Sequence, residues 1–551
     1  MQSATVTYSR AITVAPGKYA PGHLGELTPY LPFAAVDEVL EEAGRLGQRR
    51  RDLPTRVGVY WVLALALFGC GYRAGWNRLT AGLAHVAEVP MPSVTALAGL
   101  RHRVGTEPVK ALFTAVSGPL AIPGSTPGSF YRGRRVVAFD GCSSIKVRDL
   151  PCNRRWLEKI RHAVGWAGYP SLMLMTLVET GTRSIIGAGF GSLRHGERHY
   201  AHSLLPLLDT SMLLLADRGF DGNDFLAQTD ATGAAFLIRL KSARRPTIEQ
   251  RLPDGSYLTR LGHLTVRVIE ASITTTCADG THWTSNYRLA TNLLDEGPDP
   301  AERLLALYHE RWEIEVTYLA LRHTLMKGRV LSSGTPDGIR QEMWALLTVY
   351  QLLRTAMTDA AATTGLDPDR MSFTRALEAA QLSVINATGI TPTTTSPGPD
   401  TGPGTHSPPD SIHRTLLAHP LPPRRPRTST RKVKSPISRY HTAPQTGRPA
   451  RSTPVTEITL TIHHPGNPAP PPTTPPAPPR RPTRLDQIIN AIHNNPDHTW
   501  TPKEITRAIN YQGSSGTLVT QLTQWVTKGF LHKIAHGIYT PPPPTTNTTN
   551  P

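Results

Sequence analysis

The sequence predicts an α/β fold for the larger part of the chain, and two patterns carry this prediction. Between residues 130 and 385, short β-rich apolar runs alternate with segments of helical apolar spacing, which is typical of an α/β domain. From about 245 to 294 the pattern changes to strand-like alternation broken by two Asp-Gly pairs, which are strong hairpin signals. We therefore expect an α/β domain interrupted by an all-β insertion.

The strands expected in the α/β domain are short and mostly apolar. Residues 135–139 (RVVAF) form the first strand, and 172–179 and 185–190 can pair with each other. A helix is expected through 199–208. Residues 212–216 (MLLLA) are apolar throughout and short enough to form a buried central strand.

The residues before this domain predict a helical region over 24–118. Apolar residues recur at helical spacing over 34–46, 57–72 and 79–86. The run at 57–72 falls short of the about 20 residues that a membrane span needs, so we expect a buried helix and no membrane partner. The basic run at 49–51 is either a solvated loop or a phosphate contact.

Composition excludes several classes of protein. The chain has 551 residues and a formal net charge of +18, which favours a polyanionic partner such as nucleic acid. Four scattered cysteines without a CxxC pair exclude a disulfide framework and a usual thiolate zinc site, so a reducing cytoplasm is expected. Residues 391–480 are rich in Pro, Thr, Ser and Gly and carry 11 basic and 3 acidic residues. They predict a disordered basic linker.

Two aspartates come directly after strands of the predicted sheet. Asp140 follows the first strand in the motif AFDG, and Asp217 follows the strand at 212–216 in the motif LADRGF. Ligands bind at strand ends in open sheets because side chains escape the core there while the backbone stays rigid. An Asp-Gly after a strand is also an ordinary turn, but two such aspartates on neighbouring strands could together hold a divalent cation.

A third candidate group lies on a long helix expected over 299–325, which a second long helix at 342–362 follows. At about 100° per residue, Tyr308, Arg311, Glu315 and Arg322 fall within one stripe of about 60°. The two other glutamates nearby point away, so Glu315 lies beside two arginines and a tyrosine. The alternative interpretation is a solvated face of ion pairs.

In combination these motifs resemble the DDE transposases of the insertion sequence 4 type, whose catalytic domain is ribonuclease H-like. In that family the first Asp stands in a DG motif after the first strand, and the second ends the fourth strand before Arg-Gly-Phe. The Glu stands in a signature of Tyr, two residues, Arg, three residues, Glu, six residues and Lys. The matching residues are Asp140-Gly141, Asp217-Arg218-Gly219-Phe220, and Tyr308, Arg311 and Glu315, with Arg322 in place of the usual Lys.

The resemblance covers about residues 24–380 and implies a function. Asp140, Asp217 and Glu315 are the expected catalytic residues and the ligands of two Mg²⁺ or Mn²⁺ ions, with Asp140 bridging them. Two such ions stabilise the attacking and leaving oxygens of an in-line displacement at phosphorus. The implied reactions are cleavage at the ends of a mobile element and transfer of the freed 3′-OH to target DNA. The helical region 24–118 is expected to be an N-terminal DNA-binding domain.

The resemblance also suggests roles for other residues. Tyr308, Arg311 and Arg322 are expected to position DNA near the cleaved phosphate, and the alternative for Tyr308 is a covalent nucleophile of the topoisomerase type. Trp283 in the insertion is either a platform on which a flipped base stacks, as in relatives that form DNA hairpins, or a tryptophan that packs on the sheet.

Residues 484–540 resemble a winged helix domain. Helices are expected at 485–493, after a capping box that begins at Thr501, and at 517–527, followed by a small hairpin. Winged helices bind DNA or other proteins. If this one binds DNA, its third helix is the recognition helix, with candidate contacts Thr517, Thr520, Gln521, Gln524 and Lys528.

The sequence therefore predicts a metal-dependent bacterial transposase. Its expected partners are double-stranded DNA, as terminal inverted repeats and as target, and a second copy of the chain in a synaptic complex. Its expected location is the cytoplasm, in association with the nucleoid. The alternative is a transposase-derived DNA-binding regulator without catalytic activity, against which the three intact carboxylates argue.

Overall fold

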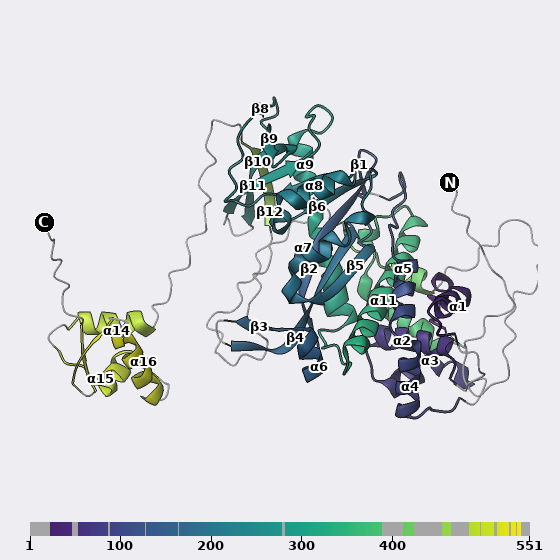
Figure 1. Ribbon diagram of the computed structural model, residues 1–551, viewed down its shortest axis with the longest axis horizontal. Helices are drawn as coiled ribbons and strands as arrows, with labels where there is room; N and C mark the ends of the chain where they lie inside the picture. Colours follow the sequence, from purple (N-terminus) through teal and green to yellow (C-terminus); the bar gives the residue numbers. More distant parts are fainter. Residues whose placement is uncertain are drawn as a thin grey trace, which may run out of the picture. The chain divides into compact units, whose positions relative to one another are not determined.

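The computed structural model (Figure 1) divides the chain into two compact units, Met1–Pro472 and Thr473–Pro551, and each is described by itself. The basic run at 49–51, Lys528 and most of the segment 391–480 lie outside the described residues. The described ranges are 23–46, 53–85, 89–126, 128–162, 165–277, 282–387, 411–423, 455–463, 484–495, 498–511, 515–527, 530–535 and 537–541.

A mixed sheet forms the centre of the first unit. Its strands β2, β4 and β5 are antiparallel neighbours, whereas β2, β6 and β7 run parallel, and the order is β5-β4-β2-β6-β7. Helices lie between the parallel strands, so the α/β class is confirmed. The bounds are β2 (Arg134–Lys146), β4 (Gly165–Glu179), β5 (Ile185–Ser192), β6 (Met212–Ala216) and β7 (Ala235–Arg239), and the helices are α7 (Gly196–His202) and α8 (Asn223–Ala231).

The β insertion extends this sheet. Strand β11 pairs antiparallel with β7 and with β10, and β9 pairs with β10 and β8. The expected all-β insertion is therefore confirmed, and it continues the catalytic sheet at the β7 edge (Figure 1). The bounds are β8 (Gln250–Arg251), β9 (Tyr257–Leu261), β10 (Leu264–Cys277) and β11 (His282–Thr291).

The first strand of the α/β region is longer than expected. Strand β2 continues past residue 139 to Lys146 because it pairs with β4, with Asp140 opposite Thr176 and Gly141 opposite Met175. The register shifts between Cys142 and Ile145. Asp140-Gly141 therefore lies inside a strand, and the alternative of an ordinary turn is wrong for this pair.

The helix expected over 299–325 is not one regular helix. It consists of α9 (Ala301–Tyr308), the 3₁₀ turn η6 (His309–Trp312), α10 (Glu313–Leu319) and the π-helical turn η7 (Ala320–Leu325). Both kinds of turn change the rotation per residue, so a constant 100° gives only approximate side-chain directions along this stretch. Single π-helical turns within helices are frequent at functional sites.

The N-terminal helices share one hydrophobic core with the catalytic region. They pack on α11 (Pro336–Ala362) and α12 (Phe373–Asn386), and buried residues of all these helices join residues of one sheet face in a single cluster. The helical region 24–118 is thus not a domain with a core of its own. Its helices are α1 (Phe33–Glu42), α2 (Thr55–Phe68), α3 (Tyr72–Thr80), α4 (Val94–Val104) and α5 (Glu107–Val116).

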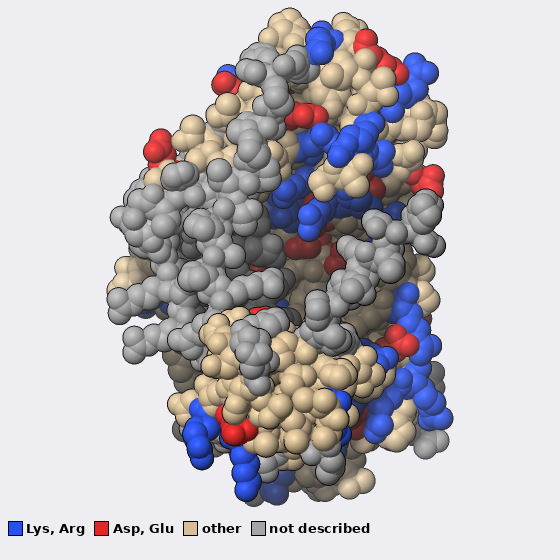
Figure 2. Space-filling model, turned by 90° about the vertical axis from the view of Figure 1, so that its left-hand side faces the viewer, with Lys and Arg blue, Asp and Glu red and all other residues tan. Residues whose placement is uncertain are grey.

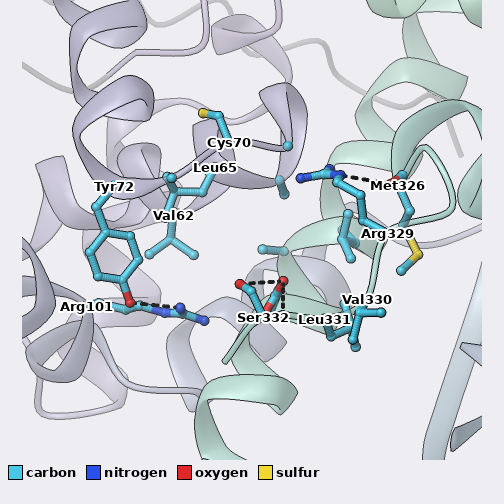
Figure 3. Close-up of a pocket in the computed structure, with 16 residues that line it drawn as sticks. Val62, Leu65, Cys70, Tyr72, Arg101, Met326, Arg329, Val330, Leu331 and Ser332 are labelled. Carbon is cyan, nitrogen blue, oxygen red and sulfur yellow. Dashed lines mark hydrogen bonds between the residues drawn. The ribbon is translucent and has the colours of Figure 1, made fainter. Parts of the chain in front are cut away.

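Polar contacts reinforce this junction. Arg101 on α4 donates to Gln341 Oε1 on α11 at 2.7 Å and to the Ser333 hydroxyl at 2.7 Å. Figure 3 shows the cavity beside it, about 290 Å³ in volume, with Cys70 and Arg329 in its wall. Within the described ranges no single helix is long and apolar enough to cross a membrane, and α2 and α3 pass that test only as a pair bent by 105°.

The prediction of disorder throughout 391–480 is wrong for two segments. Helix α13 (Ser411–Leu417) packs on α11 and α12 and buries Ile412 and Leu416. Glu26 accepts hydrogen bonds from the backbone of Ser411 and Ile412 at its first turn. Strand β12 (Val455–Ile462) pairs antiparallel with β10. Composition averaged over the segment concealed these two short apolar patterns, because Pro and Thr dominate the rest.

The second unit has three helices and a hairpin around its own small core. The helices are α14 (Arg484–His493), α15 (Pro502–Ala508) and α16 (Ser515–Thr527), and the hairpin is β13 (His532–Ala535) with β14 (Ile538–Thr540). The predicted capping box is confirmed, because Thr501 and Glu504 satisfy each other's backbone N–H groups. This is the expected winged-helix-like order. On α16, Thr520 and Gln524 are exposed and Gln521 is half-buried, while the side chain of Thr517 lies outside the described residues.

Candidate active site

The sheet register brings Asp140 and Asp217 side by side. Strands β2 and β6 are adjacent and parallel, and Ala138 pairs with Leu215, so that each aspartate lies two residues further along its strand direction. The Asp140 carboxylate accepts the Gly141 N–H at 2.9 Å, and the Asp217 carboxylate accepts the Gly219 N–H at 2.7 Å. These short local bonds hold both carboxylates at the same edge of the sheet.

Two tyrosines attach the helical stretch that carries Glu315 to both of these strands. The Tyr318 hydroxyl donates to the Asp140 carbonyl at 2.5 Å and lies 2.9 Å from the Thr176 hydroxyl. The Tyr308 hydroxyl donates to the Ala216 carbonyl, the residue before Asp217, at 3.1 Å. Glu315 is half-buried between these two anchors, on a helix that packs against β2. The predicted third carboxylate therefore belongs to the same region as the two aspartates.

Arg311 is the cation of this region. It lies in the turn η6 and its side chain is 8% exposed. Burial by itself would lower the pKa of its guanidinium, yet nearby negative groups raise that pKa above the ordinary value. Those groups are Tyr308, Asp140, Asp217 and Glu315. The Arg311 guanidinium is thus close enough to Asp140, Asp217 and Glu315 for each of them to affect its pKa.

Asp140 has the most perturbed carboxyl group of the site. Burial raises its pKa to about 7, and the charges of Asp217 and Glu197 add to this rise. Arg311 and the Gly141 N–H act in the opposite direction but do not cancel it. The ionised form of Asp140 is therefore unfavourable in the metal-free protein, and a bound cation would relieve it.

Glu313 points away from the site, as expected. It is buried and accepts a hydrogen bond from Arg183 Nε at 2.6 Å, and the same guanidinium forms an ion pair with Asp369. This cluster fastens α10 to the turn between β4 and β5. Glu313 is thus a structural residue, although only one residue separates it from Glu315 in the sequence.

The structure gives Tyr308 a contact within the protein. Its side chain is 3% exposed and its hydroxyl donates to the Ala216 carbonyl on β6, while the expected contact with DNA stays a prediction. Burial also raises its pKa to about 12, which disfavours the alternative of a tyrosine nucleophile.

Two other predicted contacts remain predictions. Arg322 is half-buried in the π-helical turn η7. Trp283 lies on β11 opposite Thr275, and its side chain is outside the described residues.

Sequence reasoning missed two charged residues of this region. Glu197, in the first turn of α7, influences the pKa of Asp140, and its Gly-Glu pattern resembles any helix start. Arg239, at the end of β7, lies with its guanidinium 3.9 Å from the centre of the Tyr287 ring and lowers the pKa of Tyr308. Figure 2 shows a hollow on one face of the molecule, with acidic residues inside it and Lys and Arg side chains along its upper side.

The carboxylates fit a divalent cation in chemistry but are not yet arranged around one. Among the described residues, no three His, Cys, Asp or Glu groups already form a metal-binding cluster. Hard cations such as Mg²⁺ prefer carboxylate oxygens, which Asp140 within β2 and Asp217 at the end of the adjacent strand β6 present. The pKa of Asp140 is raised chiefly because the carboxyl group is buried, and Arg311 offsets only part of this effect.

A ribonuclease H-like sheet with acidic residues on two adjacent strands and on a later helix defines the class of DDE transposases. A family described as "Transposase DDE domain" matches residues 131–352, and one described as "Insertion element 4 transposase N-terminal" matches residues 21–114. The chain belongs to the insertion sequence 4 type of DDE transposases.

Individual relatives agree with this assignment. The chain is 25% identical over 379 residues to the transposase InsG for insertion sequence element IS4 of Escherichia coli (strain K12), an alignment that spans 67% of this chain and 85% of the relative. Among solved structures, a cryo-EM structure of a piggyBac transposase synaptic complex with hairpin DNA aligns over 76% of this chain and 88% of its own. That alignment has 12% identity and a TM-score of 0.37.

Proposed function

We propose that this transposase binds the terminal inverted repeats of a bacterial insertion sequence, cleaves DNA at the ends and joins them to target DNA. The observation that carries the proposal is the position of Asp140 and Asp217 on paired parallel strands, with Arg311 sensing both aspartates and Glu315. The three intact carboxylates disfavour a regulator that has lost catalysis.

The proposed chemistry uses the carboxylates and arginine in different ways. Divalent metal ions held by Asp140, Asp217 and Glu315 would stabilise the attacking and leaving oxygens of an in-line displacement at phosphorus. Water attacks first and frees a 3′-OH at the element end, and that hydroxyl then attacks a phosphate of the target. Arg311 supplies positive charge at the same place and contacts the backbone phosphate. No covalent intermediate on the protein is required.

DNA binding outside the active site is proposed for the second unit. Its helix α16 exposes Thr520 and Gln524, whose polar side chains can contact base edges or phosphates in a groove of DNA. The charge of the segment 391–480 would add salt-sensitive, nonspecific attraction for DNA. We also propose that two copies of the chain act together in a synaptic complex in the bacterial cytoplasm, close to the nucleoid.

The test is cleavage of end DNA by the purified full chain with Mn²⁺ or Mg²⁺. Glu315→Gln keeps the shape of the side chain and removes its charge, so cleavage should fall by about 10³-fold or more. Glu302→Gln is the matched control, because Glu302 is an exposed glutamate at the start of α9 and its loss should leave cleavage unchanged. Cleavage at the parent rate by folded Glu315→Gln protein would refute the assignment.

A further inference from the structure

A two-stranded hairpin projects beyond the edge of the sheet at which β6 ends. It consists of β3 (Lys159–His162) and residues 165–170 of β4, which pair antiparallel. Strand β6 pairs with β2 as far as Leu215 and ends just before Asp217, whereas β2 and β4 continue together past this point. Figure 1 shows β3 and the start of β4 extending away from the other strands. We call this hairpin the β3–β4 arm.

Two aromatic side chains of the arm are exposed. Trp166 is 68% exposed, more than any other large hydrophobic side chain in the described part of the chain, and Tyr169 is 38% exposed. Residues 167–169 of β4 lie opposite the single residue Ile160 of β3, which makes a bulge between the two aromatic residues. Bulges are common at sheet edges and beside functional sites, where they redirect side chains. The packing of the fold therefore does not account for these two rings.

The charge at the base of the arm is neutralised, whereas the charge further along it is not. Lys159 and Arg154 both form ion pairs with Asp149, at 2.7 and 2.9 Å. Arg161 is exposed and forms no ion pair within the described ranges, and its guanidinium lies 5.8 Å from the centre of the Trp166 ring. A guanidinium held over an aromatic ring keeps N–H groups available for a phosphate.

This combination favours double-stranded DNA as the partner of the arm. Residues 146–170 include six basic and two acidic residues, and both acidic residues, Asp149 and Glu158, already form ion pairs. The centre of a protein–protein interface is usually depleted of charge, whereas arginines beside exposed apolar side chains are typical of surfaces that contact phosphates and a DNA groove.

The arm lies almost one helical turn of DNA away from Asp140. Thr176 pairs with Asp140, and Trp166 precedes Thr176 on β4 by ten residues. At about 3.3 Å per residue this separation is about 30 Å, which corresponds to about nine base pairs. DNA is straight over this distance, because its persistence length is about 500 Å. A duplex that leaves Asp140 along β4 therefore passes beside the arm.

We propose that the β3–β4 arm binds duplex DNA about nine base pairs from the phosphate that is cleaved. Arg161 contacts a backbone phosphate, and Trp166 packs against the sugars of the adjacent groove. The inference rests on the proposed cleavage of element ends and adds a second contact for the same DNA. The alternative occupant of the arm is a second copy of the chain.

The first experiment measures the Kd of the purified full chain for fluorescent duplexes that carry the element end, in EDTA so that no cleavage occurs. The duplexes continue past the cleavage position by about 5 or about 15 base pairs, on each side in turn. Combined Arg161→Ala and Trp166→Ala should raise the Kd by about tenfold for the longer duplex on one side. The Kd for the shorter duplexes should not change. Unchanged Kd values for every duplex would overturn the proposal.

The dependence of the Kd on salt separates the two side chains of the arm. Arg161→Ala should reduce the slope of log Kd against log salt concentration by about 1, because one phosphate contact is lost. Trp166→Ala should weaken binding without this change in slope. Both side chains are exposed, so neither substitution disturbs the core.

Matched controls come from exposed residues outside the arm. Leu382 is 59% exposed on α12, and Arg303 is exposed on α9. Leu382→Ala and Arg303→Ala remove a similar apolar surface and a similar charge, so they should leave the difference between long and short duplexes as it is in the parent. If they reduce that difference as strongly as the arm variants do, the effect is not specific to the arm and the proposal is wrong.

Two further measurements distinguish the other outcomes. If Trp166→Ala reduces self-association in light scattering while the Kd for the long duplex is unchanged, the arm joins two copies of the chain and the proposal is wrong. If the parent cleaves end DNA with Mn²⁺ and the arm variants bind every duplex as it does, only the role of the arm is wrong. If the parent neither prefers the end duplex to a scrambled one nor cleaves it, the proposed function is wrong and this inference falls with it.

Discussion

Two groups of carboxylates lie on either side of the helix α10, and they differ in how their charge is met. Glu313 and Asp369 both contact the buried guanidinium of Arg183, whose backbone carbonyl accepts the Tyr350 hydroxyl at 2.8 Å. On the other side, Asp140 has a pKa raised to about 7 although Arg311 lies close by. In the first cluster a guanidinium pairs directly with both carboxylates, whereas at Asp140 the nearby Arg311 does not offset the effect of burial.

The comparison teaches how one short sequence serves both stability and function. Glu313 and Glu315 are separated by a single residue, and helical geometry directs them to opposite sides of α10. The buried cluster fastens the helix to the β4–β5 turn through Arg183. Each cluster can be tested by a substitution that changes a residue of that cluster alone.

The largest expected effect is on catalysis at the cluster of Asp140, Asp217 and Glu315 near Arg311, which we call the open cluster. Asp140→Asn should reduce cleavage of end DNA by about 10³-fold or more, because it removes the carboxylate shared by the proposed metal ions. Its unfolding free energy should stay the same or rise, because the buried charge that it removes is unfavourable. A marked loss of stability in urea would place Asp140 with the structural residues instead.

The next effect is on stability at the cluster of Arg183, Glu313 and Asp369, which we call the closed cluster. Glu313→Gln should lower the unfolding free energy by about 3 kcal/mol, because it breaks one side of a buried ion pair. Glu158→Gln breaks an exposed ion pair with Arg194 and should cost less than about 1 kcal/mol. Urea unfolding measures both, and equal losses would contradict the distinction between the clusters.

A smaller effect is expected where α10 is tied to β2. Tyr318→Phe removes the hydroxyl that donates to the Asp140 carbonyl and should lower the unfolding free energy by about 1–3 kcal/mol. It should also lower the cleavage rate, because Glu315 loses one of its two anchors. Tyr350→Phe removes a comparable buried hydroxyl at the closed cluster and should lower stability without a matching loss in the rate of the folded protein.

The last comparison is the dependence of stability on pH. Asp140 has a raised pKa, so the folded protein holds a proton there that the unfolded chain releases near the ordinary carboxyl pKa of about 3.9. Its contribution to stability is present at low pH and declines as pH rises from about 4 to about 7. Asp140→Asn lacks this titration, so its stability relative to the parent should rise across that window and then level off. A constant difference would mean that the pKa is not raised.

The alternation of β-rich runs with helical spacing was enough to predict the fold class, while the assignment of Asp140, Asp217 and Glu315 as catalytic residues stays a prediction. Strand boundaries were harder, because β2 continues beyond Asp140 only through its pairing with β4. The burial of Tyr308 could not be predicted either, since it depends on the packing of α9 next to β6, which is distant in the sequence. Glu197 could not be singled out from the sequence, because a Gly-Glu pair is common at the start of a helix.

The sequence by itself determined the catalytic motifs, the winged-helix-like unit with its capping box and the basic excess, because these depend on residue type and local spacing. Only the tertiary structure decided which carboxylates share a site and which are neutralised inside the fold. It also showed that segments of the Pro-rich region return as α13 and β12 to complete the helical core and the inserted sheet. The physical reason is that burial and charge at one point are set by residues from distant parts of the chain, whose meeting no local pattern specifies.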